Sequence, residues 1–354
     1  MRDFNIFGPV YPNKHYYLDR QEVKQQLHSK IEKGRYFTLN AARQMGKTTF
    51  LKDLINEHAK HGTYFAILLD FQALAYLEKS EFYENMGLMI ERWRKHYEPS
   101  APAASNMRNH GDFLEWLRRT STTLGKQGIL IIDEFEAVSP DLFTPLLTQF
   151  RSMYLARENP YEYALQSIIL TGVHTIASLL EGTQSPFNIA DQLTIPYFSF
   201  EESKTLLEQH TTEIGQRFDK ETIQEIYDQS QGHPFLVNRL GKMLTEEIVP
   251  MPNTIEPTTE AVEQYTVTAT HFERAMSRLL NEDNTHFNTV TSKSKPHRTF
   301  LLPMLFYNQF KTNFREEVTS ELLMFGVLRV IEDEDGFQSA RIANPIYQKI
   351  PSTK

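Results

Sequence analysis

A short segment that joins a glycine to a lysine and a threonine carries the clearest chemical signal in the sequence. Residues 41–48, Ala-Ala-Arg-Gln-Met-Gly-Lys-Thr, match the phosphate-loop pattern G-x-x-x-x-G-K-[ST] except at the first position, where Ala41 replaces glycine. A loop of this kind points backbone N–H groups at phosphate oxygens at the start of a helix, where anions are favoured. We therefore expect Lys47 to reach the β- and γ-phosphates of a nucleotide, and Thr48 to offer its hydroxyl to Mg²⁺.

Two adjacent carboxylates form the second candidate group. Asp133 and Glu134 directly follow the apolar, β-forming run of residues 129–132. Carboxylates at the end of a buried strand are costly unless something there uses them. In a phosphate-loop protein Asp133 would orient Mg²⁺ through water, and Glu134 would polarise the attacking water. The alternative is a buried strand followed by a solvated acidic turn, but the preceding Lys47 favours the catalytic interpretation.

Other polar residues could complete such a site. Thr171 closes a third apolar run, where its hydroxyl could sense the γ-phosphate or its water, or could be an ordinary strand-end residue. Arg43 could contact a neighbouring subunit or simply face the solvent. Arg151 could act as an arginine finger or interface residue, although a solvated helix charge is the simpler interpretation.

A second segment, Gly232-His233-Pro234, opens a helix further along the chain, where the missing N–H of proline costs nothing. It is either a simple helix-opening turn or a nucleotide contact, with Pro234 against the adenine and Arg239 approaching the phosphates. The residues predicted to bind ATP are Ala42, Arg43, Gln44, Met45, Gly46, Lys47, Thr48, Thr49, Pro234 and Arg239; those predicted to act in catalysis are Glu134, Lys47 and Thr171; and those predicted to hold the metal are Thr48 and Asp133.

These residues require a particular arrangement of strands and helices. Three continuous apolar runs and one short β-rich run have the composition of strands, and stretches with helical character separate them. Strands that are apolar throughout and alternate with helices predict an α/β fold, a parallel sheet with helices on both faces. The predicted strands are residues 35–40, 64–71, 128–134 and 167–172.

The pattern changes near residue 199. Helices alone are predicted at 200–214, 219–230 and 233–248, and they would form a lid. A linker should follow over 250–267, and Thr270 with Glu273 should cap the next helix. Two further helices and a hairpin, with strands 326–331 and 337–342, suggest a winged-helix-like module. The predicted domains are 1–198, the ATPase core with an N-terminal adenine-side segment; 199–249, the lid; and 250–354, the linker and C-terminal module.

The overall composition excludes several classes of protein. The chain has no cysteine, which rules out disulfides and thiolate zinc sites, and its histidines show no zinc-binding spacing. The net charge of −8 argues against coating of nucleic acid by bulk charge. The basic segment 293–298 is expected to be a solvated linker. No signal peptide or stretch of roughly 18 to 20 apolar residues occurs, so we expect a cytoplasmic protein without a membrane contact.

Taken together, these motifs resemble the bacterial AAA-like domain family, which is related to STAND and archaeal-type ATPases. The matching segments are residues 8–10 (Gly-Pro-Val), 17–20 (Tyr-Leu-Asp-Arg), 43–48 (Arg-Gln-Met-Gly-Lys-Thr), 131–134 (Ile-Ile-Asp-Glu), 185–188 (Ser-Pro-Phe-Asn) and 232–237 (Gly-His-Pro-Phe-Leu-Val). The resemblance implies an ASCE-type P-loop domain with a helical lid and often a winged helix. It also implies binding of ATP or ADP with Mg²⁺, and the roles given above for Thr48, Asp133, Glu134, Thr171 and Pro234.

The favoured function is a slowly hydrolysing, ATP-dependent switch or assembly ATPase. It would act with an unidentified protein partner or effector in defence, signalling or a mobile element, and it could be a homo-oligomer. One alternative is a DNA-bound ATPase resembling initiators or transposition regulators. That alternative needs a basic helix within 300–325, where Lys311 and Arg315 are followed by glutamates. Another is a nucleotide-binding scaffold without turnover.

Overall fold

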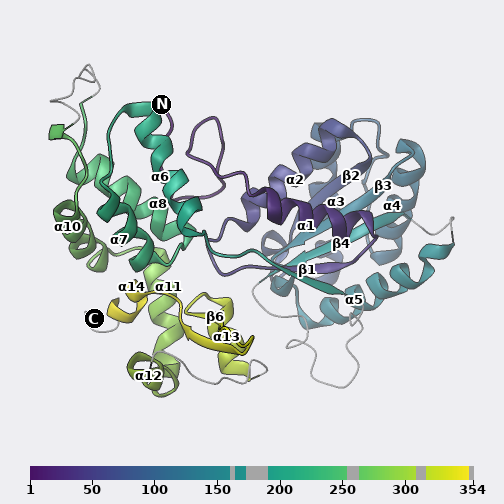
Figure 1. Cartoon of the computed structure of the whole chain (residues 1–354). Helices are drawn as coiled ribbons and strands as arrows, with labels where there is room; N and C mark the ends of the chain where they lie inside the picture. Colours follow the sequence, from purple (N-terminus) through teal and green to yellow (C-terminus); the bar gives the residue numbers. More distant parts are fainter. Residues whose placement is uncertain (160–163, 173–189, 253–262, 308–315, 351–354) are drawn as a thin grey trace. The chain divides into compact units, whose positions relative to one another are not determined.

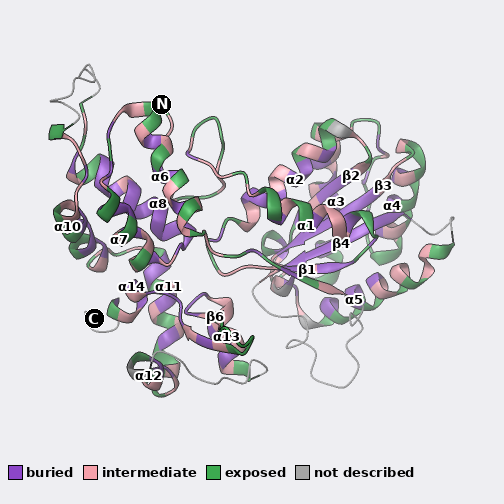
Figure 2. Cartoon of the chain, in the orientation of Figure 1, coloured by how far each residue is buried: buried purple, intermediate pink, exposed green. Residues whose placement is uncertain are grey.

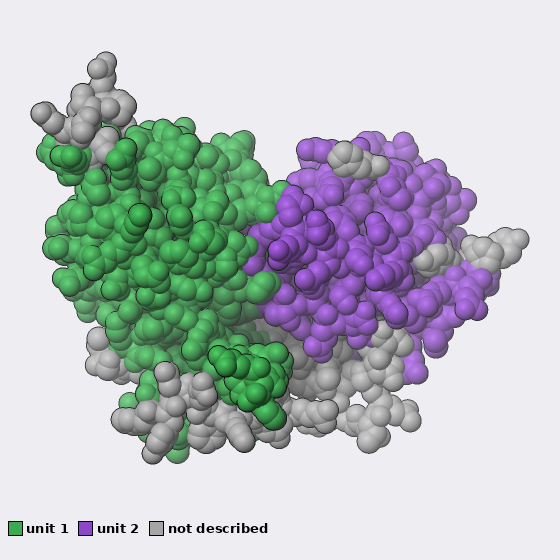
Figure 3. Space-filling model, viewed as in Figure 1, with its two compact units in different colours: residues 1–19, 42–46, 196–354 green, residues 20–41, 47–195 purple. Residues whose placement is uncertain are grey.

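The computed structural model divides the chain into two compact units, which are coloured separately in Figure 3. We call residues 20–41 and 47–195 the sheet unit, and residues 1–19, 42–46 and 196–354 the helical unit. The three-domain division predicted from the sequence remains a prediction. The structure describes residues 1–159, 164–172, 190–252, 263–307 and 316–350. The predicted motif at 185–188, most of the expected linker, and Lys311 and Arg315 lie outside these ranges.

A parallel sheet forms the centre of the sheet unit, as predicted, and it has five strands rather than the four predicted. Its order is β2-β3-β4-β1-β5, so that β4 separates β1 from β3. The fifth strand, β5, was not predicted, because only one of its four residues is buried and its sequence is mostly polar. The strands are β1 (Phe37–Asn40), β2 (Tyr64–Asp70), β3 (Gln127–Asp133), β4 (Leu165–Thr171) and β5 (Asp191–Thr194).

Helices bury both faces of this sheet (Figures 1 and 2). Along β3, Ile129 and Ile131 pack in one apolar core, whereas Leu130 and Ile132 pack in the other. This two-sided burial explains why the strands are continuous apolar runs rather than alternating ones. One core contains α1 (Gln21–Glu32) and α2 (Lys47–His61); the other contains α3 (Lys79–Tyr97), α4 (His110–Leu124) and α5 (Pro140–Leu155); and short 3₁₀ turns occur at η1 (Phe71–Leu74), η2 (Phe135–Ala137) and η3 (Ala156–Glu158).

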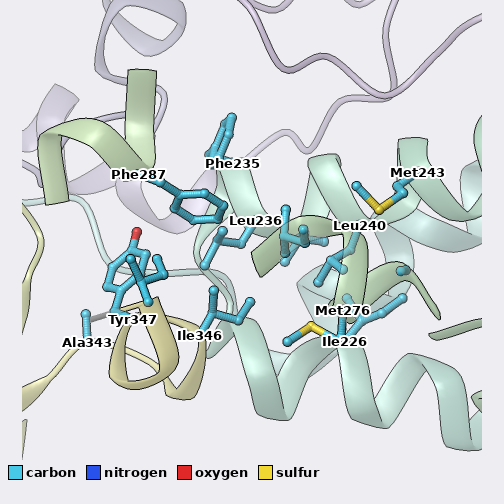
Figure 4. Packing of buried hydrophobic residues seen from close by; sticks show 14 of the residues in the cluster. Ile226, Phe235, Leu236, Leu240, Met243, Met276, Phe287, Ala343, Ile346 and Tyr347 are labelled. Carbon is cyan, nitrogen blue, oxygen red and sulfur yellow. The ribbon is translucent and has the colours of Figure 1, made fainter. Parts of the chain in front are cut away.

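Helices and one antiparallel hairpin, β6 with β7, share a single core in the helical unit. In Figure 4, Leu236 of α8 and Ile346 of α14 are among the side chains of this core. The elements are α6 (Phe200–Ile214), α7 (Lys220–Ser230), α8 (Pro234–Lys242), the π-helical turn η4 (Met243–Ile248), α10 (Ala269–Leu280), α11 (Thr285–Ser294), η5 (Lys295–His297), α12 (Arg298–Tyr307), α13 (Glu317–Met324), β6 (Leu328–Glu332), β7 (Gln338–Ile342) and α14 (Pro345–Lys349).

The N-terminal segment belongs to the helical unit through its aromatic residues. Phe4 and Tyr16 are each 1% exposed, and the ring of Phe4 lies so close to α8 that a Cβ on Gly241 would come within 2.9 Å of it. The Tyr16 hydroxyl also forms a 3.0 Å hydrogen bond with His210 of α6. Burying such aromatic side chains contributes about 1.5–3 kcal/mol each, which accounts for the attachment of this segment.

Two local expectations for the helical unit were wrong. The helix predicted to be capped by Thr270 and Glu273 begins two residues earlier, where the backbone N–H of Thr268 donates to Nδ1 of His271 at 3.2 Å. A histidine ring nitrogen can accept this bond as a glutamate would, and the sequence pattern does not reveal that. The basic segment 293–298 is helical rather than a linker, because it continues α11, whose Phe287 and Val290 pack in the core; Lys293 and His297 also pair with Glu321.

The order helix, helix, hairpin near the C-terminus agrees with the sequence prediction in its described parts. The hairpin pairs Leu328 with Ile342 through Glu332 with Gln338. Its turn is closed by Asp333, whose side chain accepts from the N–H groups of Asp335 and Phe337. The assignment of this module as a winged helix stays a prediction. None of the described helices combines the length and the apolar character needed to cross a membrane.

Candidate nucleotide-binding site

Asp133 is the centre of the candidate site in the sheet unit. It ends β3, and its carboxylate is buried at 6% exposure. One carboxylate oxygen accepts from the Thr171 hydroxyl at 2.5 Å and from the backbone N–H of Glu134 at 3.2 Å. The other accepts from the Thr48 hydroxyl at 3.4 Å. The chain thus brings together three residues that the sequence had placed at the ends of β3 and β4 and at the start of α2.

These three residues meet because of the strand order. The carboxyl ends of parallel strands lie along one edge of a sheet, and β4 lies between β1 and β3. Thr171, at the end of β4, is therefore positioned next to Asp133 and next to the turn that follows β1. Ligands of open α/β sheets bind at this carboxyl edge, so the position of the group agrees with a binding role.

Lys47 points its ammonium group into the same region. Its side chain is only 10% exposed, and Nζ lies 4.0 Å from Oε1 of Glu134. The same Nζ donates to the backbone carbonyl of Gly172 at 3.4 Å. Both contacts are long, and a strong charge-assisted hydrogen bond would be 2.7–2.9 Å. The ammonium group can therefore exchange these partners for phosphate oxygens at small cost.

Glu134 has an unusual backbone. Its φ is +52°, in the left-handed region that residues other than glycine seldom occupy. Such conformations cost of order 1–3 kcal/mol and occur most often at functional sites. The chain turns sharply at Glu134, between β3 and η2. The Glu134 side chain is 31% exposed, so a water molecule could reach it.

The residues before Lys47 group with the helical unit. Gln44 and Gly46 both have positive φ, +59° and +86°, while Met45 is buried. Within the helical unit, Arg43 donates to the Thr289 hydroxyl of α11 at 3.2 Å. Ala42 packs against the turn before β6, since a Cβ on Gly326 would come within 2.9 Å of its side chain. This packing of the loop was not expected from the sequence.

Two of the predicted nucleotide contacts lie on α8 of the helical unit. Pro234 is buried in the first turn, as expected for a proline that opens a helix. Arg239 is 9% exposed, and its guanidinium pairs with Glu247 at 2.6 Å and with Glu282 at 2.9 Å. An approach of Arg239 to a phosphate would have to break both ion pairs. Its predicted role in binding ATP therefore requires a rearrangement of the helical unit.

Next to Pro234, a pair of buried histidines occupies the core of the helical unit. His233 is fully buried, and burial lowers its pKa to about 3, although the nearby backbone carbonyl of Arg43 opposes the shift. Its ring lies 5.1 Å from that of His286, which shares a 2.5 Å hydrogen bond with Tyr347. Burial likewise lowers the pKa of His286 well below its ordinary value. Both rings are therefore neutral at physiological pH.

Thr49 and Arg151 are the two remaining candidates. Thr49 is buried in the first turn of α2, and Arg151 is half-buried on α5.

Among the described residues, no three His, Cys, Asp or Glu side chains are grouped so that they could hold a metal ion. A magnesium ion does not need such a group, because it is commonly held by one or two side chains, water and substrate phosphates. Thr48 and Asp133 fit that requirement.

Comparison with known proteins identifies the family. A family model described as an AAA-like domain matches residues 117–299, which is just over half of the chain, and one described as a predicted AAA-ATPase matches residues 34–179. No curated protein sequence matches the chain.

Solved structures resemble the whole chain. The Walker-type ATPase of Pyrococcus abyssi superposes with a TM-score of 0.65 at 17% identity, covering 98% of this chain and 99% of its own. The ORC2 protein of Aeropyrum pernix gives 0.48 at 13% identity, covering 99% and 96%. The RuvB branch migration motor of Thermotoga maritima gives 0.45 at 13% identity, covering 94% and 95%. The family model that matches more than half of the chain shows that the chain belongs to the AAA-like domain family, and its fold is that of a P-loop ATPase.

Proposed function

We propose that the protein binds ATP with Mg²⁺ at the carboxyl edge of its sheet and hydrolyses it slowly as part of a conformational switch. The observation that carries this proposal is the hydrogen-bonded group Thr48–Asp133–Thr171, with Lys47 and Glu134 beside it. Each member has the chemistry that phosphoryl transfer needs at its position.

The contacts of the site residues support a separate role for each of them. Lys47 lies 4.0 Å from Glu134, and in the nucleotide complex it would instead bind the β- and γ-phosphates. Glu134 would then be released to accept a proton from the attacking water. Thr48 and Asp133 would hold Mg²⁺, which neutralises charge on the phosphates when bound. Thr171 keeps the Asp133 carboxylate oriented by donating to its Oδ1.

A switch rather than a metabolic enzyme is supported by the loop that precedes Lys47. Residues 42–46 pack against α11 and the turn at Gly326 through Arg43 and Ala42. In P-loop proteins this loop wraps around the phosphates. A change of the loop on nucleotide binding would therefore alter contacts made by the helical unit, and through them a protein partner or another copy of the chain.

Binding of duplex DNA has less support. The hairpin turn between β6 and β7 carries the exposed acids Glu332, Asp333, Glu334 and Asp335, which would repel phosphates. Lys293 and His297 are already paired with Glu321. A gel shift with duplex DNA at physiological salt would test this alternative.

Lys47→Ala tests the proposed site. The variant should lose ATP binding, measured by calorimetry or with a fluorescent ATP analogue, because the loop then lacks the lysine ammonium group that is expected to bind the β- and γ-phosphates. Lys52→Ala, at a partly exposed lysine about one turn further along α2, is a matched control that should bind ATP normally. ATP binding by Lys47→Ala at the wild-type affinity would refute the site assignment.

A further inference from the structure

Two arginines of the hairpin in the helical unit lie directly opposite each other. Arg329 of β6 and Arg341 of β7 are register partners in the antiparallel pair, so their side chains leave the same face. Both guanidinium groups donate to one atom, Oε1 of Gln231, from Nη2 at 2.7 and 3.0 Å respectively. Like charges directly opposite on two strands are destabilising, so this convergence needs an explanation.

No anion in the described part of the chain compensates the two charges. Neither arginine forms an ion pair with a described carboxylate, although both side chains are partly buried. The Nε of Arg329 is fully buried and has no hydrogen-bond partner among the described residues. Burial lowers the pKa of Arg341, as expected for a cation that lacks an adjacent negative charge. The C-terminal end of α7 supplies only a partial negative charge of about one half.

Gln231 is held so that its oxygen must face the arginines. Its side-chain amide nitrogen donates to the backbone carbonyl of Asp228 at 2.9 Å, which fixes the orientation of the amide. The residue itself has φ +52°, a left-handed conformation at the end of α7. A neutral amide oxygen thus accepts hydrogen bonds from two guanidinium groups.

We propose that Arg329 and Arg341 form a binding site for a phosphoryl group, whose oxygens replace the Gln231 amide oxygen. A phosphate monoester carries a charge of about −1.5 to −2 at neutral pH, which balances two guanidinium groups, whereas a carboxylate balances only one. Guanidinium forks also bind phosphate oxygens in pairs. The ligand is a phosphate compound that binds within the helical unit.

The test uses the full chain carrying Lys47→Ala, which silences the nucleotide site, and inorganic phosphate as the probe. Phosphate should bind in calorimetry and raise the melting temperature. The further double substitution Arg329→Gln/Arg341→Gln should weaken phosphate binding by about ten-fold or more. Arg274→Gln, at an exposed arginine on α10, is the matched control and should leave phosphate binding unchanged.

A second variant keeps the proposal testable even if the double variant folds poorly. Gln231→Glu places a carboxylate where the amide oxygen lies, so it should raise the melting temperature without phosphate and abolish phosphate binding. Equal phosphate affinity with and without the two arginines would overturn the site. Equal affinity for phosphate and acetate would overturn the assignment to a phosphoryl ligand.

Two measurements on the chain with Lys47 intact separate this site from the proposed nucleotide site. The double substitution should leave the ATP affinity unchanged, and phosphate should still bind at saturating ATP. Loss of phosphate binding at saturating ATP would overturn a separate phosphate site. Because the Lys47→Ala background removes the nucleotide site, failure here is separable from failure of the proposed ATPase function.

Discussion

The hydrogen bond between Thr171 and Asp133 is the contact that most directly orders the candidate site, and replacing Thr171 by valine would remove it. Valine keeps the shape of threonine, so the strand and the core around it should remain intact. The bond is buried, with Thr171 2% and Asp133 6% exposed, and its acceptor is charged. Hydrogen bonds to charged groups contribute about 1.5–3 kcal/mol to stability, and we expect Thr171→Val to lose about that amount.

The assay is equilibrium unfolding in urea, followed by circular dichroism. A loss of this size corresponds to a fall in melting temperature of about 3–12 °C for a unit of this size. Thr38→Val is a matched control, because the Thr38 hydroxyl on neighbouring β1 is buried and has no hydrogen-bond partner among the described residues. That variant should be neutral or stabilising. Equal effects of Thr171→Val and Thr38→Val would refute the reasoning.

Three further predictions concern the helical unit. Arg239→Met should lower the free energy of unfolding by about 1–2 kcal/mol, because Glu247 and Glu282 lose their shared cation but remain 39% and 26% exposed; urea denaturation checks this, and wild-type stability would contradict it. Gly232→Ala should destabilise still more clearly, since its φ is +73° and a Cβ would lie 1.9 Å from the carbonyl oxygen of Phe198; a melting temperature equal to wild type would exclude that close approach. Because the folded pKa of His233 is about 3 and the unfolded value is near 6.5, the unfolded state binds more protons between these pH values. The contribution of His233 to stability should therefore be full above about pH 6.5 and fall by up to about 1.4 kcal/mol per pH unit below it, and His286, whose pKa is also lowered, should add to this fall. His233→Gln should make the fall less steep in unfolding measured from pH 7 to 5, and an unchanged slope would show that His233 is not responsible.

The sequence was most informative for strands that are buried on both faces of the sheet, because burial restricts their residues to apolar types. The buried strands β2, β3 and β4 are continuous apolar runs, so their existence and their parallel arrangement could be predicted, and with them the meeting of Lys47, Thr48, Asp133 and Thr171. The edge strand β5 has one buried residue, and so it left no comparable pattern.

Contacts between distant residues could not be predicted. Arg239 has the spacing of a phosphate-binding residue, yet one of its partners, Glu282, lies 43 positions further along the chain. Gln231 meets Arg329 and Arg341 across 98 and 110 positions, and nothing local marks any of the three. Such pairs depend on how the helical unit packs, which helix periodicity does not specify.

Glu134 is proposed to activate water at a site where Lys47, Thr48 and Asp133 hold ATP with Mg²⁺. Phosphate release from radiolabelled ATP by Glu134→Gln, combined with the ATP affinity of the same variant, tests this role. We predict ATP binding close to wild type and hydrolysis slower by about 10²–10⁴-fold, the usual contribution of a general base. Wild-type hydrolysis by Glu134→Gln, or loss of ATP binding in a folded variant, would contradict the account.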